Sequence, residues 1–253
     1  MSTHEPLLDL LEARDGIVCA VGAGGKKSVL QQLAARHPGR AALTATVAIT
    51  HFPPGLGLEI VIDGDEQLPA RVAAICPAVG VAYACPSDKP GRHAGVAGHV
   101  IERIHREQGF AATYVKADGA RMRWIKAPAG NEPVLPPGCT GIVAVVSARA
   151  IGEPLDERVA HRIDHVGRVT GLKAGERIAP VHVGRLIADP DGLYRNAPGR
   201  RFVPLINMVD DDEREKFGRE AAEAALALNP AVERVVLCCL RRPDDPVVAV
   251  VRR

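Results

Sequence analysis

The residues best suited to chemistry are the glycines and lysines of the stretch Gly22–Ser28, which reads GAGGKKS. Glycines let backbone N–H groups approach an anion without a Cβ in the way, and a lysine can reach phosphate oxygens. An apolar, β-branched run precedes this stretch and helical apolar spacing follows it, so we expect a strand, a loop and a helix in that order. The N-terminus of that helix would add unpaired amides and the positive end of its dipole. The stretch predicts a phosphate site of the P-loop kind.

Two registers of the P-loop pattern G-x-x-x-x-G-K-[ST] remain open. With Gly25 and Lys26 as the glycine and lysine, the position of the magnesium-binding hydroxyl holds Lys27. A shift by one residue makes Lys27 the phosphate lysine and Ser28 the magnesium ligand, but then Lys26 stands in the place of a glycine. An ordinary tight turn with exposed lysines is the alternative to both.

Asp118 follows directly after the apolar run from Phe110 to Ala117. In P-loop proteins an aspartate at the end of a strand holds the magnesium ion or its water, opposite the phosphate. Asp118 with Ser28 or Thr46 is therefore the expected magnesium site. A plain Asp-Gly turn is the alternative.

Asn207 and Asp210 follow another apolar run, Phe202–Ile206. The spacing is that of Asn-Lys-x-Asp, in which the aspartate accepts from guanine and the asparagine fixes the loop; here Met208 replaces the lysine. This spacing predicts a base pocket, and helix capping by the same residue types is the alternative.

Apolar periodicity predicts many strands that alternate with helices, which is typical of an α/β fold with a doubly wound, mostly parallel sheet. Helices are expected over Glu5–Ala13, Asp65–Ala74 (capped by Asp65), Ala94–Gln108, Ile178–Asp189 and Asp211–Leu228. A further helix is expected to carry His161, Arg162 and His165; we interpret its two histidines as a polar face rather than a metal site. We expect one domain, 1–253, with 128–198 as a helical cap or insertion.

Composition favours a cytoplasmic protein that binds neither nucleic acid nor membrane. The net charge is +2 over 253 residues, which gives no basic footprint for nucleic acid. No apolar run is long enough for a membrane span, and residues Met1–Pro6 lack the features of a signal peptide. The six cysteines contain no C-x-x-C pair, which is typical of reduced thiols.

The set of motifs resembles the YqeC-type selenium-dependent hydroxylase accessory proteins, from about Leu7 to Leu228. The motifs that carry the resemblance are Val21–Lys26, Ala117–Arg121, Lys126–Pro128, Glu132–Pro136, His161-Arg162 and Leu205–Asn207. The resemblance implies a P-loop NTPase-like protein that uses ATP or GTP and magnesium, with a molybdenum hydroxylase or its maturation proteins as partner. This chain has Lys27 where the family usually has threonine, which weakens the expected magnesium site and puts hydrolase activity in doubt more than binding.

On this hypothesis Lys26, Asp118 and Arg121 are the catalytic residues, and Arg121, Lys126 and Glu132 form a polar wall that faces the loop. The residues expected to bind nucleotide or phosphate are Gly22, Ala23, Gly24, Gly25, Lys26, Lys27, Ser28, Thr46, Lys126, Glu132, Asn207 and Asp210. The alternative function is a non-catalytic scaffold that binds a phosphate-bearing cofactor such as a molybdopterin.

Overall fold

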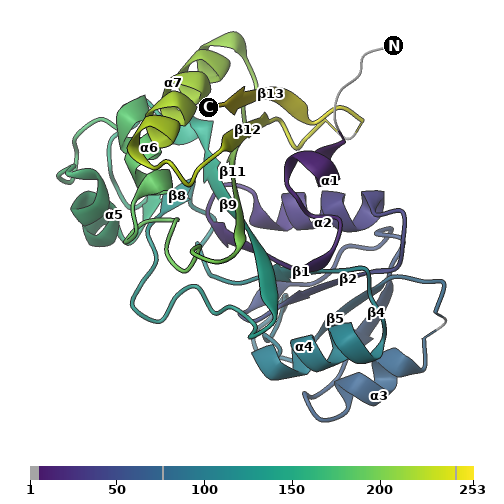
Figure 1. Ribbon diagram of the computed structural model, residues 1–253. Coiled ribbons are helices and arrows are strands. Elements are labelled where there is room, and N and C mark those ends of the chain that lie inside the picture. The colour runs from purple at the N-terminus through teal and green to yellow at the C-terminus, as the bar shows by residue number, and fades with distance from the viewer. Residues whose placement is uncertain (1–5, 76, 243) are drawn as a thin grey trace. The chain divides into compact units, whose positions relative to one another are not determined.

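The computed structural model describes residues 6–75, 77–242 and 244–253 (Figure 1). Within it the chain divides into two compact units. The first unit comprises residues up to 20, 27–118 and 134–141; the second comprises 21–26, 119–133 and 142–253. Each unit is an α/β arrangement with its own buried strands, and we describe each by itself.

The strands of the first unit are ordered β1-β7-β2-β5-β4, and every neighbouring pair is parallel. Their bounds are Gly16–Gly22 (β1), Ala112–Lys116 (β7), Ala41–Ala45 (β2), Val81–Ala84 (β5) and Glu59–Ile62 (β4). The middle strands are apolar on both faces because helices cover both faces of a parallel sheet. Tyr83 and Tyr114 are fully buried in this core. The carboxyl ends of these strands therefore point to one edge, where Thr46 and Asp118 follow β2 and β7.

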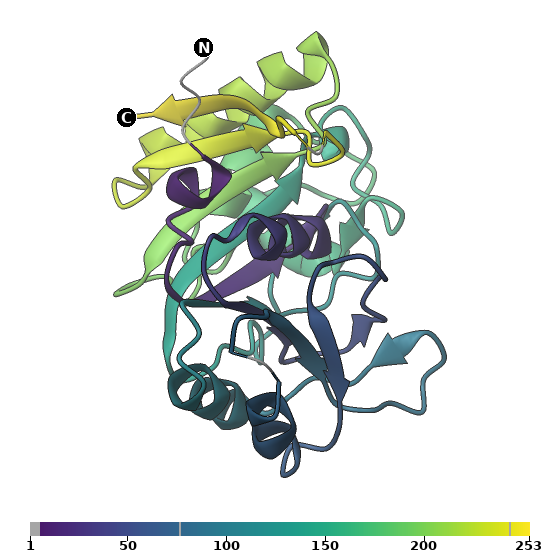
Figure 2. The ribbon, with the colours of Figure 1, turned by 90° about the vertical axis from the view of Figure 1, so that its right-hand side faces the viewer.

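Helices lie on both sides of these strands, α2 on one face and the adjacent α3 and α4 on the other (Figures 1 and 2). The helices of this unit are α1 (Leu7–Leu10), α2 (Lys26–Arg36), α3 (Leu68–Ala73) and α4 (Gly98–Glu107), and β3 (Ile49–Thr50) pairs with β6 (Arg92–His93). We expected Asp65 to cap α3, but this prediction is wrong. Asp65 accepts instead from the Ala97 amide at 3.0 Å, because α3 begins three residues later than predicted.

The described strands of the second unit include the series β13-β12-β11-β9, in that spatial order. Their bounds are Val247–Arg252 (β13), Arg234–Cys238 (β12), Arg201–Asn207 (β11) and Cys139–Ser147 (β9). β11 and β12 are parallel, and β13 runs antiparallel to β12. A separate pair joins β8 (Ile125–Lys126) to β10 (Ala160–His161).

The helices of this unit are η1 (Ala148–Ala150), α5 (Ile163–Thr170), α6 (Pro180–Ala188) and α7 (Asp212–Leu228). α6 and α7 pack side by side, as Figures 1 and 2 show. Gly184 permits the close approach, because a Cβ there would lie 2.6 Å from the Ala224 Cβ. The Asp211 side chain caps α7 by accepting from the Arg214 amide at 2.9 Å.

The predicted α/β class with mostly parallel strands flanked by helices is confirmed. The helix expected to carry His161, Arg162 and His165 is wrong in its first part, because His161 lies in β10 and α5 begins at Ile163. The expected helix Glu5–Ala13 is α1, although Glu5 itself, like the rest of 1–5, lies outside the described residues. The prediction that Met1–Pro6 are not part of a signal peptide therefore also lies mostly outside the described residues. In the described part of the chain no helix has the length and apolar character to cross a bilayer.

Candidate functional site

The segment Gly22–Lys26, which we call the glycine loop, joins β1 to α2. Gly22, Gly24 and Gly25 all have positive φ, at 90°, 84° and 144°. A Cβ on Gly22 would lie 2.2 Å from the Val145 carbonyl oxygen, and one on Gly25 would lie 2.3 Å from the Asn207 Nδ2. The backbone conformation and the close neighbours both require glycine, which makes this a cradle built from main chain.

Not every amide of the glycine loop is available to a ligand. The Ala23 amide donates to the Val145 carbonyl at 2.8 Å, and the Gly24 amide donates to the Arg123 carbonyl at 3.1 Å. The first residues of α2 lack intrahelical acceptors for their amides. An anion at this loop would therefore meet the amides from Gly25 onward.

The two lysines of the stretch have different surroundings. Lys26 is buried at 5% exposure, and its ammonium group donates to the Gly22 carbonyl. Lys27 is exposed and donates to the Thr50 hydroxyl at 3.0 Å, and Ser28 is exposed as well. Lys26 thus lies inside the glycine loop, which favours the register in which Gly25 and Lys26 are the glycine and lysine of the pattern.

Asn207, at the end of β11, contacts the glycine loop directly. Its Nδ2 donates to the Gly24 carbonyl at 2.8 Å, and its Oδ1 accepts from the Leu240 amide at 3.1 Å. The residue is 4% exposed. Buried side-chain hydrogen bonds of this kind fix the position of a loop, because each lost partner leaves a buried polar group unsatisfied.

Asp210 lies three residues further on and is held by cations. Its carboxylate receives Arg149 Nη2 at 2.6 Å, Arg241 Nη2 at 3.0 Å and the Cys239 thiol at 3.2 Å. Burial alone would raise the pKa of Asp210, but the hydrogen bonds from Cys239, Arg149 and Arg241 outweigh it and lower the pKa. Asp210 is therefore an ionised anchor for two arginines.

A charge cluster of five residues lies in the same unit: Arg121, Lys126, Glu132, His161 and Arg162. The pairing of β8 with β10 puts Lys126 opposite His161. Lys126 is fully buried, and its Nζ lies 2.6 Å from Glu132 Oε2 and 2.8 Å from the Gly119 carbonyl oxygen. Arg162 Nη1 contacts the same Glu132 oxygen.

The remaining expected site residues belong to the first unit. Asp118 follows β7 and is 1% exposed. The Thr46 hydroxyl donates to the Val134 carbonyl at 2.6 Å, and Lys116 Nζ donates to the Ala48 carbonyl at 2.6 Å. The first unit thus holds Lys27, Ser28, Thr46 and Asp118, and the second holds the glycine loop, Arg121, Lys126, Glu132, Asn207 and Asp210.

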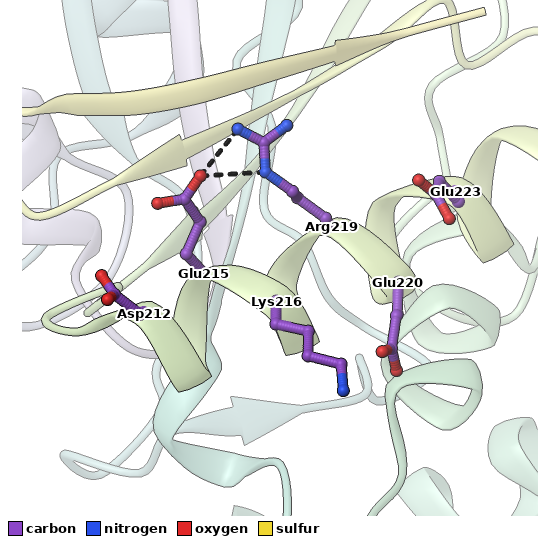
Figure 3. A pocket seen from close by; sticks show the side chains of 6 residues that line it. All are labelled: Asp212, Glu215, Lys216, Arg219, Glu220 and Glu223. Atoms are coloured by element: carbon purple, nitrogen blue, oxygen red, sulfur yellow. Dashed lines mark hydrogen bonds and ion pairs between the residues drawn. The ribbon is translucent and has the colours of Figure 1, made fainter.

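Two other features bear on ligand binding. Within the described ranges, no three side chains of His, Cys, Asp or Glu gather closely enough to hold a metal ion. A shallow hollow follows the outer face of α7, where Glu215 and Arg219 form an ion pair at 2.7 Å (Figure 3). Its lining consists of Asp212, Glu215, Lys216, Arg219, Glu220 and Glu223. The mixed charges at helical spacing are those of a solvated helix face.

The family described as "YqeC protein" matches residues 18–164, which is more than half of the chain. The chain belongs to this family. It is 26% identical over 206 residues to "Uncharacterized protein YqeC" of Escherichia coli (strain K12), covering 80% of this chain and 79% of that protein. No solved structure matches.

A shorter similarity links the chain to cobyric acid synthases. The enzyme of Polaromonas naphthalenivorans (strain CJ2) is 30% identical over 115 residues, and that of Variovorax paradoxus (strain S110) is 31% identical over 110 residues. The matches cover 43% and 41% of this chain but only 22% and 21% of the synthases. The chain thus shares one stretch with these enzymes and spans a minor part of their length.

Sequence reasoning missed several residues that surround the expected ones. Ser147 donates to the Met208 sulfur at 3.1 Å, and Arg149 and Arg241 hold Asp210. The Arg162 contact with Glu132 was not predicted either, although both residues were part of recognised motifs. No sequence signal joins these positions, because the contacts depend on which strands are neighbours.

Proposed function

We propose that this YqeC family member binds a nucleoside triphosphate, ATP or GTP, through the glycine loop and the first turn of α2. The observation that carries the proposal is the loop itself, whose three glycines take positive φ beside close neighbours and enclose the Lys26 ammonium. The phosphates would receive amides from Gly25 onward and the charge of Lys26, which leaves the Gly22 carbonyl when the anion arrives. The partial similarity to cobyric acid synthases is consistent with nucleotide binding.

Magnesium is expected to matter less here than in ordinary P-loop proteins. Lys27 occupies the hydroxyl position of the favoured register, and an ammonium group cannot ligate a cation. Asp118 with Ser28 or Thr46 remains the proposed magnesium site. Without a strongly held ion, turnover is expected to be slow even where binding persists.

Lys26→Ala tests the proposal. The variant removes a charge-assisted contact of about 1.5–3 kcal/mol, so nucleotide affinity should fall roughly tenfold or more. Lys27→Ala is the matched control, because it removes the same charge from the next residue, whose ammonium contacts Thr50. Isothermal titration with ATP and with GTP measures both variants.

If only Lys27→Ala loses nucleotide affinity, the second register holds: Lys27 is the lysine that contacts phosphate, and Ser28 is the expected magnesium ligand. Unchanged affinity in both variants would refute nucleotide binding at this loop. Repeating the titrations with EDTA separates the charge of the lysines from that of a bound ion.

The second candidate is a non-catalytic scaffold that binds a phosphate-bearing cofactor, such as a molybdopterin, and hands it on. The lysine at the hydroxyl position favours it, because it supplies phosphate charge without the ion that catalysis needs. Release of phosphate from ATP or GTP by the purified protein separates the two candidates. Turnover that disappears in Asp118→Asn would support the first.

The cellular role that we propose is maturation of a molybdenum hydroxylase, selenium-dependent enzymes included. Family membership supports this role, since the chain retains the Ala117–Arg121 and Lys126–Pro128 motifs of the resemblance. Molybdenum hydroxylase activity in cells that lack the protein, complemented by the wild type or by Lys26→Ala, tests it. Equal hydroxylase activity with and without the protein would refute the role.

A further inference from the structure

The charge cluster carries more positive than negative charge. Arg121, Lys126 and Arg162 are cations, and Glu132 is the carboxylate of the cluster, which pairs with Lys126 and Arg162. Burial opposes ionisation of Glu132, but hydrogen bonds from Lys126 and Arg162 hold its pKa at about 2, so it is ionised at neutral pH. Burial and the three cations lower the pKa of His161 to about 4, so His161 is neutral. The cluster therefore has a charge of +2 at pH 7.

Several donors of the charge cluster have no acceptor among the residues that the structure describes. Arg162 uses Nη1 for Glu132, and its Nε and Nη2 make no hydrogen bond there. The Arg121 guanidinium and the His161 ring likewise have no hydrogen-bond partner in the described ranges. Glu132 directs one oxygen, Oε2, to both Lys126 and Arg162. The acidic residue thus positions two cations while their outer donors stay available.

The backbone at the charge cluster is strained at three positions. Arg121 and Met122 are consecutive left-handed residues, with φ of 46° and 63°, and Arg162 has φ of 63°. Such conformations are costly for residues with a Cβ and collect at ligand sites. Met122 is 89% exposed, so no packing of its side chain explains the turn. Arg121 itself is exposed, and it is near enough to His161 to help lower the pKa of that residue.

We propose that the charge cluster is a binding site for a doubly charged oxyanion, the phosphate group of a small phosphorylated ligand other than the nucleotide. A dianion matches the surplus of two positive charges, and planar guanidinium groups suit phosphate oxygens. Lys126 and Glu132 set the position of Arg162, while Arg121, Arg162 and His161 donate to the ligand. The proposal goes beyond nucleotide binding at the glycine loop and does not depend on it.

The single tryptophan provides the readout, because Trp124 lies between Arg121 and Lys126 in the chain. Titrating the full-length protein with inorganic phosphate should give a saturable change in Trp124 fluorescence. Arg121→Gln and Arg162→Gln should each weaken phosphate binding about tenfold or more. Within the described ranges the Arg121 side chain makes no hydrogen bond that Arg121→Gln could remove, so the fold of this variant is expected to stay intact even if Arg162→Gln is unstable.

Arg158→Gln is the matched control, since Arg158 is exposed, pairs with Asp156 and lies four residues before Arg162. It should bind phosphate like the wild type, and equal weakening in this variant would overturn the proposal by showing a general charge effect. Lys26→Ala should also keep the phosphate response. Loss of that response in Lys26→Ala, or its suppression by saturating ATP, would assign the anion to the nucleotide and overturn a separate site. Wild-type affinity in Arg121→Gln and Arg162→Gln would overturn it as well.

Discussion

The glycine loop and the charge cluster lie in the same unit but are built by opposite means. The glycine loop consists of main chain: positive φ at three glycines, amides, and one lysine turned onto a carbonyl. The charge cluster consists of side chains that come from β8, β10 and the segments beside them. Adding a single Cβ should therefore destroy the first, whereas removing a charge should destroy the second.

Gly22→Ala should have the largest effect. Its Cβ would lie 2.2 Å from the Val145 carbonyl oxygen, which cannot retreat without loss of its hydrogen bond to the Ala23 amide. The left-handed backbone alone adds about 1–3 kcal/mol of strain, so we expect a lower free energy of unfolding and loss of nucleotide binding. Urea unfolding and ATP titration measure both quantities.

Gly130→Ala is the control, because Gly130 lies in the same unit with open space around its Cα. It should leave stability and nucleotide affinity nearly unchanged. Wild-type ATP affinity in Gly22→Ala would show that the main chain of the loop is not what binds the nucleotide.

Asn207→Ala should have an intermediate effect. It removes the donor to the Gly24 carbonyl and the acceptor of the Leu240 amide, at a cost of about 1–3 kcal/mol. If Asn207 acts through the glycine loop, affinity for ATP and for GTP should fall by the same factor. Asn207→Asp should do equal damage, because it keeps the acceptor for Leu240 but turns an oxygen toward the Gly24 carbonyl.

Loss of GTP binding alone in these variants would instead make Asn207 part of a base pocket. Phosphate binding at the charge cluster should persist in both, and its loss would mean that the two regions are not independent.

The smallest effect is expected from His161, through pH. Its pKa is about 4 in the folded chain against an ordinary value of 6.5. Above pH 6.5 both states are neutral at this residue and it contributes nothing. Between pH 6.5 and 4 the unfolded chain takes up a proton that the folded chain does not, so the free energy of unfolding decreases as the pH falls. Urea titrations across this range should show a shallower decrease in His161→Gln, and identical slopes would contradict the assignment.

The glycine loop was predictable from sequence because all of its signals are local. Glycine cluster, preceding apolar run and following helical spacing are adjacent in the chain, and β1 and α2 are found there. The charge cluster was predictable only in part. Its members form two separate groups in the chain, one within 121–132 and the other at 161–162. The groups meet through β8 and β10, two strands of two residues each that are too short to leave an alternating pattern.

The fold was predictable where strands are buried on both faces. Short, continuous runs of apolar and β-branched residues such as Ile142–Val146 are typical of strands in the middle of a parallel sheet. The ends of elements were not. Asp65 looked like a helix cap, but its carboxylate binds the Ala97 amide, a contact set by tertiary structure. The base-pocket hypothesis for Asn207 and Asp210 stays a prediction. The partner of the Asn207 amide group, the Gly24 carbonyl, belongs to a segment far away in the chain, so only the structure identifies it.

β13 has a consequence for solubility. Among the strands that the structure describes it is the outermost of its order, and it runs antiparallel to β12. Its outer side is therefore a sheet edge with which another chain could pair. Four of its six residues are valines, a composition prone to aggregation. A register shift in the pairing between Leu237 and Cys238, and the charges of Arg252 and Arg253 beside the valines, oppose such pairing. Replacing Arg252 and Arg253 with neutral residues should therefore increase pairing of β13 between molecules, while the glycine loop and the charge cluster stay unchanged in sequence.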